Sequence, residues 1–144
     1  MLPHEFIVFL DEISACFIAK EFEPWHARLL YPFRLETPQG PNILIDKRDA
    51  KINFDHYLTA CHAMRLTKIF RLPQDIRPNG DGTWSGRYET HLMRHGQRMD
   101  APYTSTAILR KTDGIWKMNA ILNARGHYTW TKAAPKGQRD IALT

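Results

Sequence analysis

Two histidines stand four residues apart in the stretch ETHLMRHG, at His91 and His95, and this spacing can form a zinc site on a helix. Residues i and i+4 of a helix lie on one face, so their imidazoles can bind the same ion. On a strand the two residues share a face but stand roughly 13 Å apart, too far for one metal ion. Metal binding therefore depends on which element contains this stretch.

A second group of acids and bases, Asp55, His56 and His62, lies in a stretch with helical periodicity. Asp55 and His62 share one side of such a helix but stand two turns, roughly 10 Å, apart. We therefore expect no direct pair: Asp55 and His56 are expected in solvent, and His62 at the edge of the core. His26 and His91 are further candidates, each at the mouth of a cavity or on the surface.

Composition indicates a single globular domain. The chain has 144 residues, 43% hydrophobic and 24% charged, which is enough to bury a core without disulfides or metals. Cys16 and Cys61 have no CxxC spacing and lie on predicted helix faces, so we expect free thiols. No apolar run approaches the ~20 residues of a membrane span, and acids stand where a signal peptide needs basic and apolar residues. We expect a cytoplasmic protein with no membrane partner and no cofactor.

The net charge of +5 raises the question of nucleic acid binding. The basic residues are spread along the chain and interrupted by acids, which indicates a solvated surface and no nucleic acid partner. These residues are Arg28, Arg34, Lys47, Arg48, Lys51, Arg65, Arg71, Arg87, Arg94, Arg98, Arg110 and Lys117.

The C-terminal segment, residues 127–144, is expected to be a basic, flexible tail on a single domain of residues 1–126. Lys132, Lys136 and Arg139 stand there around a proline and a glycine. This composition is typical of a mobile terminus.

Two stretches have the period of an amphipathic helix. In residues 4–20, Phe6, Leu10, Ile13 and Phe17 recur at spacings of four, three and four. The second stretch covers residues 47–65, where Asp46 can cap the helix. Its apolar residues recur at three and four: Ala50, Phe54, Tyr57, Leu58, Cys61 and Met64.

The segment between these helices fits two structures. Pro24 after Glu23 predicts the first turn of a short helix to about Leu30, followed by a strand at 32–37. The alternation of apolar residues from Trp25 onward also fits a strand. TPQGPN has turn chemistry and predicts a hairpin or wide loop.

Four stretches of strand length follow the second long helix: residues 66–78, 83–95, 101–112 and 115–124. The turn sequences NGDG, HGQR and TDG separate them, so we expect a meander of antiparallel strands. His91 and His95 then belong to a strand, and no third ligand is placed to complete a site. We predict no metal site.

The alternation of residues assigns an inner and an outer face to these strands. On the second strand the even residues are the more apolar and are expected inside: Trp84, Tyr88, Thr90 and Leu92. On the last two strands the expected inner residues are Tyr103, Ser105, Ala107 and Leu109, and then Trp116, Met118, Ala120 and Leu122. None of these is an acid.

The order of elements resembles that of the nuclear transport factor 2-like superfamily, including its SnoaL-like branch. The resemblance covers residues 4–124 and rests on YPFRLETPQG, the helix from Asp46, and HLMRHGQRMDAPYTSTAILRKTDGIWKM. It implies an α+β cone, in which a curved antiparallel sheet wraps around the N-terminal helices and leaves an internal cavity. Physically, two one-sided helices and a sheet with one apolar face can bury these surfaces only against each other.

Such a cavity suits a small hydrophobic or amphipathic molecule. Members of this superfamily include isomerases, cyclases, dehydratases and epoxide hydrolases, and also binding and scaffolding proteins without catalysis, so the fold alone does not select a function. An isomerase or cyclase of this kind needs a carboxylate or histidine inside the cavity, usually opposite a tyrosine or an acid. Glu89 is out of phase and Asp100 adjoins a turn, so we assign no catalytic residue.

The residues predicted to line the cavity are Trp25, Tyr57, His62, Tyr88, Thr90, Tyr103 and Met118. Tyr88 and Tyr103 equally fit core tyrosines whose hydroxyls reach water or backbone. An interior filled by the chain's own side chains would favour the alternative, a non-catalytic homodimeric scaffold. A desolvated acid or histidine within reach of a tyrosine would favour an enzyme.

We expect a homodimer, since the resemblance implies that the outer face of the sheet packs against a second copy. Met93 and Ile121 are the apolar residues expected on that face. Sedimentation of a monomer at micromolar concentration would contradict this prediction.

Overall fold

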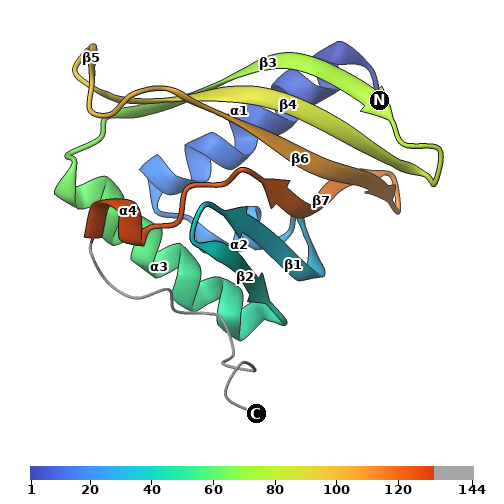
Figure 1. Ribbon diagram of the computed structural model, residues 1–144, viewed down its shortest axis with the longest axis horizontal. Helices are drawn as coiled ribbons and strands as arrows, with labels where there is room; N and C mark the ends of the chain where they lie inside the picture. Colours follow the sequence, from blue (N-terminus) through green and yellow to red (C-terminus); the bar gives the residue numbers. More distant parts are fainter. Residues whose placement is uncertain (132–144) are drawn as a thin grey trace.

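The computed structural model describes residues 1–131 and shows helices packed on the inner face of one curved sheet (Figure 1). In chain order the elements are α1 (Pro3–Ala19), α2 (Phe22–His26), β1 (Leu29–Thr37), β2 (Gly40–Leu44), α3 (Lys47–Ala63), β3 (Lys68–Pro78), β4 (Thr83–Arg94), β5 (Gln97–Arg98), β6 (Tyr103–Thr112), β7 (Ile115–Leu122) and α4 (Tyr128–Thr131). The α+β architecture and the curved sheet around the N-terminal helices, both expected from the sequence, are confirmed, and the sheet is open.

The strand order of the sheet is β2-β1-β7-β6-β4-β3, with the short β5 paired to β4. β3, β4, β6 and β7 form the expected antiparallel meander. β1, however, runs parallel to β7, so the sheet is mixed and the prediction of a purely antiparallel sheet is wrong. Turn sequences predict the pairing only of strands that are close in sequence. The β1–β7 pair joins the two ends of the domain, so no turn sequence indicates it.

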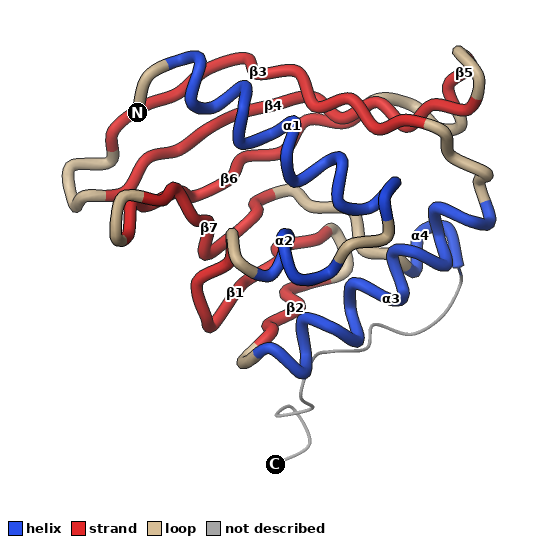
Figure 2. The backbone as a smooth tube through the Cα atoms, turned by 180° about the vertical axis from the view of Figure 1, so that it is seen from behind, coloured by secondary structure: helices blue, strands red, loops and turns tan. Residues whose placement is uncertain are grey.

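The helices cover the concave side of the sheet (Figure 2). α1 begins with Pro3. The backbone N–H of Leu2, the residue before the helix, donates to Glu5 Oε1 at 2.7 Å. α3 begins after Asp46, whose Oδ1 accepts from the backbone N–H of Asp49 at 3.1 Å, as a capping residue does. No helix within residues 1–131 has the length and apolar character needed to cross a bilayer.

An aromatic cluster joins the three N-terminal helices. Phe17 of α1 stacks on Phe54 of α3 with ring centroids 4.8 Å apart, and Trp25 of α2 lies 5.3 Å from the same ring. α2 ends at His26 and β1 starts at Leu29, three residues before the predicted strand. The parallel pairing of β1 with β7 begins at Leu29, which explains the early start of the strand.

A bulge in β7 changes which residues face inward. The register against β6 shifts between Met118 and Ala120, so Asn119 is an extra residue. A bulge shifts the alternation by one position. Ile121 therefore lies on the inner face and Leu122 is 39% exposed, so the inward prediction for Leu122 is wrong. Ile121 no longer supports an outer-face dimer, and the dimer stays a prediction.

The segment predicted as a tail is partly within the described residues. His127 is fully buried and Tyr128–Thr131 form α4. The rings of His127 and His56 stack with centroids 4.6 Å apart, which holds α4 on α3. Residues 132–144, which carry the basic residues of the predicted tail, lie outside the described part of the chain.

Close packing of α1 on the sheet requires a glycine in β4. A Cβ atom at Gly86 would stand 2.5 Å from the ring of Phe6, well inside van der Waals contact. Phe6 is only 1% exposed and its ring also meets Tyr88 edge-on at 6.4 Å, so it has little freedom to move.

We predict that Gly86→Ala lowers the free energy of unfolding by about 1–3 kcal/mol, because the added methyl overpacks the contact with Phe6. Phe6→Leu alone is also destabilising, yet the double variant should lose less than the sum of the two single changes. Urea unfolding of the four proteins measures this coupling. Additive losses would show that Phe6 does not limit the space at Gly86.

Candidate functional site

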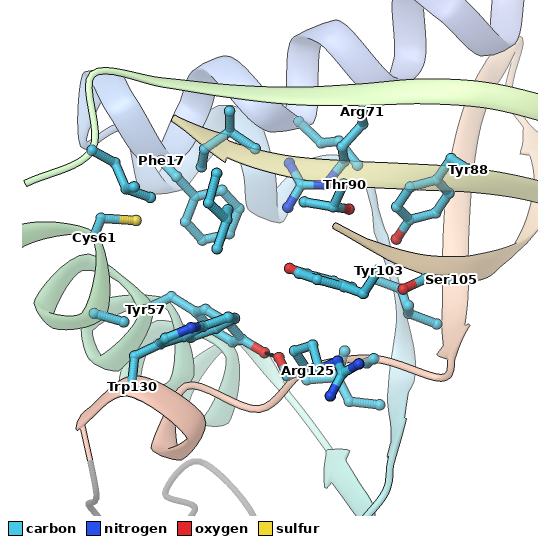
Figure 3. A pocket seen from close by; sticks show the side chains of 18 of the residues that line it. Phe17, Tyr57, Cys61, Arg71, Tyr88, Thr90, Tyr103, Ser105, Arg125 and Trp130 are labelled. Atoms are coloured by element: carbon cyan, nitrogen blue, oxygen red, sulfur yellow. Dashed lines mark hydrogen bonds between the residues drawn. The ribbon is translucent and has the colours of Figure 1, made fainter. Parts of the chain in front are cut away.

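A pocket of about 70 Å³ lies between the inner face of the sheet and helices α1 and α3 (Figure 3). We call it the central pocket. Its apolar walls include Phe17, Trp25, Met64, Leu66, Ile69, Leu92, Met118 and Ile121, and its polar lining comprises Tyr57, Cys61, Arg71, Tyr88, Thr90, Tyr103, Ser105 and Arg125. The space is small: at about 30 Å³ per water in the liquid, it corresponds to about two waters.

Three polar side chains form a row across the concave face. The sheet register pairs Arg71 of β3 with Thr90 of β4, and Thr90 with Tyr103 of β6. Directly paired residues project from the same face of a sheet, so the three side chains are neighbours in the pocket. Tyr88 stands two residues before Thr90 in β4, on the same face of the strand, and pairs with Ser105 of β6. The alternation of residues predicted this inner position.

The predicted position of Arg71 is wrong. It was expected on a solvated surface, but its guanidinium points into the central pocket (Figure 3). Its Nη1 donates to Ser14 Oγ of α1 at 2.8 Å, and its guanidinium carbon lies 5.9 Å from the centre of the Phe17 ring. The available signal was its phase, since it stands two residues after Ile69, which is 7% exposed.

The tyrosine hydroxyls and the thiol of the pocket keep their protons at neutral pH. Burial raises the pKa of Tyr103 to about 12, the pKa of the Cys61 thiol to about 11, and the pKa of Tyr57 well above its usual value. Arg71 opposes each of these shifts without cancelling it. The hydroxyl of Tyr57 donates a hydrogen bond to the carbonyl oxygen of Arg125. The hydroxyls can therefore act as hydrogen-bond donors, whereas the protonated thiol is a poor nucleophile.

Thr90 contributes a hydroxyl that the fold leaves without a hydrogen bond. The residue is 1% exposed, and its Oγ1 has no partner in good hydrogen-bond geometry. The hydroxyl of Tyr103 is near enough for Thr90 to lower its pKa slightly against the effect of burial. An unpaired buried hydroxyl lowers stability, which makes Thr90 a candidate for contact with a ligand.

Two residues that follow β7 cover the open side of the pocket. Trp130 of α4 packs against Tyr103, with ring centroids 6.3 Å apart, and its Nε1 donates to Asp100 Oδ2 at 2.8 Å. The guanidinium carbon of Arg125 lies 5.3 Å from the centre of the Tyr103 ring, and Arg125 Nε is buried without a partner. The predicted domain ended at residue 126 and so did not include Trp130.

Six of the seven residues predicted to line a cavity are brought together in the central pocket: Trp25, Tyr57, Tyr88, Thr90, Tyr103 and Met118. Their contact with a ligand stays a prediction. His62 is exposed on α3 and lines a separate groove at the surface. Successive helical residues are rotated by about 100°, which turns His62 away from the pocket when Cys61 faces it.

The remaining sequence candidates lie outside the pocket lining. His91 projects from the outer face, as expected, but it is only 8% exposed and its Nε2 lies 2.6 Å from Glu89 Oε1. His26 Nδ1 lies 2.6 Å from the hydroxyl of Tyr31. Asp55 forms an ion pair with the lysine one helical turn before it. Each of these side chains has a partner that accounts for its position.

His91 lies in β4, as predicted, but the strand ends at Arg94 and His95 lies in the turn that follows, so the prediction that His95 belongs to the strand is wrong. Within residues 1–131, no cluster of three or more histidine, cysteine, aspartate or glutamate side chains is arranged to hold a metal ion.

Comparisons with known proteins show what the chain is similar to in structure. No family model matches it, and no curated protein matches its sequence. Aln2 from a Streptomyces species matches with a TM-score of 0.64 and 11% identity over 85% of this chain and 90% of that chain. An NTF-2 like protein of unknown function from Shewanella oneidensis matches with a TM-score of 0.60 and 11% identity over 85% and 98%. A domain of unknown function with a cystatin-like fold from Nostoc punctiforme matches with a TM-score of 0.62 and 13% identity over 87% and 79%. At these identities the likeness shows a shared fold.

We predict that Thr90→Val leaves the free energy of unfolding unchanged or raises it by up to about 1 kcal/mol, because it removes a buried hydroxyl that has no partner. Thr83→Val is the matched control on the same strand. Thr83 is 8% exposed, and its hydroxyl accepts from Asn79 Nδ2 and donates to Asp81 Oδ1. The control should lose about 1–3 kcal/mol in urea unfolding. Equal losses in both variants would mean that the Thr90 hydroxyl is bonded in solution.

Proposed function

Because the chain has the nuclear transport factor 2-like fold, we propose that it binds a small, mainly hydrophobic or amphipathic molecule in the central pocket. The observation that carries this proposal is a space of about 70 Å³ whose apolar walls surround the unpaired hydroxyl of Thr90. A volume that the chain's own side chains leave open and a buried hydroxyl without a protein partner each lower the stability of a fold. Both become favourable when a ligand fills the space and bonds the hydroxyl.

The size of the pocket limits what it encloses. Sites that bury a whole drug-sized ligand usually measure about 300 Å³ or more. The central pocket therefore suits a short chain or part of a ring, and a larger ligand would extend toward Arg125 and Trp130 at the mouth. A rearrangement of the contact between Trp130 and Asp100 would admit such a ligand.

The chemistry of the lining favours binding over proton-transfer catalysis. Among the described residues that line the pocket there is no aspartate, glutamate or histidine. The raised pKa values of Tyr57, Cys61 and Tyr103 remove these groups as bases at neutral pH. An isomerase or cyclase needs a proton carrier at this place, so the pocket supports a binding protein better than an enzyme of either class.

We predict that 1-hexanol, a small neutral amphipathic probe, binds in the central pocket. In methyl-labelled protein the NMR signals of Ile13, Ile69 and Ile121 should shift on titration, because these residues line the pocket. The signal of Ile115, which is 45% exposed and lies outside the pocket, should stay in place.

A filling substitution tests the same prediction. Ala60 lines the pocket and is 1% exposed, so Ala60→Leu should occupy the space and weaken 1-hexanol binding by about tenfold or more. Ala63→Leu, on the exposed side of the same helix, is the control and should bind as the natural protein does. Undiminished binding by a folded Ala60→Leu variant would place the probe elsewhere and reject the proposal.

A further inference from the structure

We infer that the central pocket selects an anionic ligand, an amphipathic molecule whose carboxylate binds Arg71 while its apolar part lies against the helices. The inference rests on the proposed function and specifies the ligand class for the same pocket. It is carried by the charge of the lining and by the polar groups that the fold leaves unpaired.

The lining of the pocket is cationic. Arg71 and Arg125 both contribute to it, and no carboxylate does within the described residues. The ion pairs found among residues 1–131 involve neither arginine. Removing a charged group from water without a counter-ion is unfavourable, so an arginine in this setting favours a negatively charged partner.

The partners of Arg71 hold its side chain in place but leave donors free. Ser14 Oγ accepts from Arg71 Nη1 and itself donates to the carbonyl oxygen of Leu10 at 2.6 Å, so α1 fixes one side of the guanidinium. The ring of Phe17 lies beside it, 5.9 Å from the guanidinium carbon. A guanidinium carries five N–H donors in a planar fork that matches the two oxygens of a carboxylate.

The row of side chains next to Arg71 completes an oxyanion-binding surface. Thr90 is directly paired with Arg71 in the sheet and offers a buried hydroxyl without a partner. Tyr103 is paired with Thr90 on the other side, and its hydroxyl also points into the pocket (Figure 3). One carboxylate at this place can accept from the guanidinium and from a neighbouring hydroxyl.

The rest of the lining matches an apolar group. Four apolar side chains from α1, the C-terminal end of α3, the loop after it and β4 line the pocket: Phe17, Met64, Leu66 and Leu92. Phe17 lies on the side of the pocket away from Ser105 (Figure 3). An inorganic anion would leave this surface uncovered. The two chemistries together therefore indicate one molecule with a carboxylate and a short apolar body.

Matched probes test the inference: hexanoate, 1-hexanol and hexanamide share the apolar chain and differ in the charge and hydrogen bonding of the head group. We expect the natural protein to bind hexanoate about tenfold or more tightly than either neutral probe, as a charge-assisted hydrogen bond in a partly buried site implies. NMR titration of the methyl signals gives the three dissociation constants. Inorganic phosphate should not produce the same shifts.

Variants identify the side chain that recognises the negative charge of the ligand. Arg71→Gln should abolish the preference for hexanoate and leave 1-hexanol binding within about twofold, since the apolar contacts remain. Arg87→Gln, which removes an exposed arginine from β4, is the control for net charge and should keep the preference. If Arg71→Gln does not fold, Thr90→Val should still weaken the binding of hexanoate more than the binding of 1-hexanol. The comparison of hexanoate with hexanamide in the natural protein also tests whether the pocket prefers an anionic ligand.

The outcomes separate the two proposals. Binding of 1-hexanol with equal or weaker binding of hexanoate would overturn the anionic ligand and leave the proposed function standing. A preference for hexanoate that survives Arg71→Gln, or phosphate binding as tight as that of hexanoate, would also overturn it. Failure of all three organic probes to bind would remove the proposed function itself.

Discussion

The register of β3, β4 and β6 is the constraint on which the central pocket depends. It places Arg71, Thr90 and Tyr103 side by side on the concave face. Side chains alternate between the two faces of a strand, so a slip of one residue in any pair would send that strand's contribution to the outer face. The buried residues in the same phase, among them Leu92 and Leu109, oppose such a slip because it would expose them to water. Hydrophobic burial thus positions the polar groups.

The helices determine how much space remains above this row. The stacking of Phe17 on Phe54 joins α1 to α3, and the contact of Phe6 with the backbone at Gly86 sets how near α1 lies to β4. Interiors of proteins are close-packed, so a volume that the chain's own side chains leave open indicates that the elements are held apart by contacts elsewhere. In this protein the aromatic contacts at the meeting point of the helices have that effect, and the pocket lies beside them.

The polar interior is unfavourable for stability on its own. Thr90 Oγ1 and Arg125 Nε have no partners, and Arg71 has a hydroxyl and an aromatic face but no carboxylate. Buried polar groups in folded proteins are normally paired, and groups that are not paired gather where ligands bind. Of the five buried polar side-chain atoms without a partner among residues 1–131, these two lie in the central pocket, and the proposed binding role rests on them.

Local patterns in the sequence determined the element types, the meander of β3, β4, β6 and β7, and the inner phase of Tyr88, Thr90 and Tyr103. These features depend on periods of two and 3.6 residues and on turn chemistry, which a sequence displays directly. Tertiary structure alone decided the parallel pairing of β1 with β7, the bulge at Asn119, and the packing of α4 that brings Trp130 over the pocket. Arg71 has the same strand phase as Ile69, but the tertiary structure decided that this charged side chain follows the inward phase, where it meets Ser14 and Phe17. Such features arise from contacts between residues distant in sequence, whose energies no window along the chain contains.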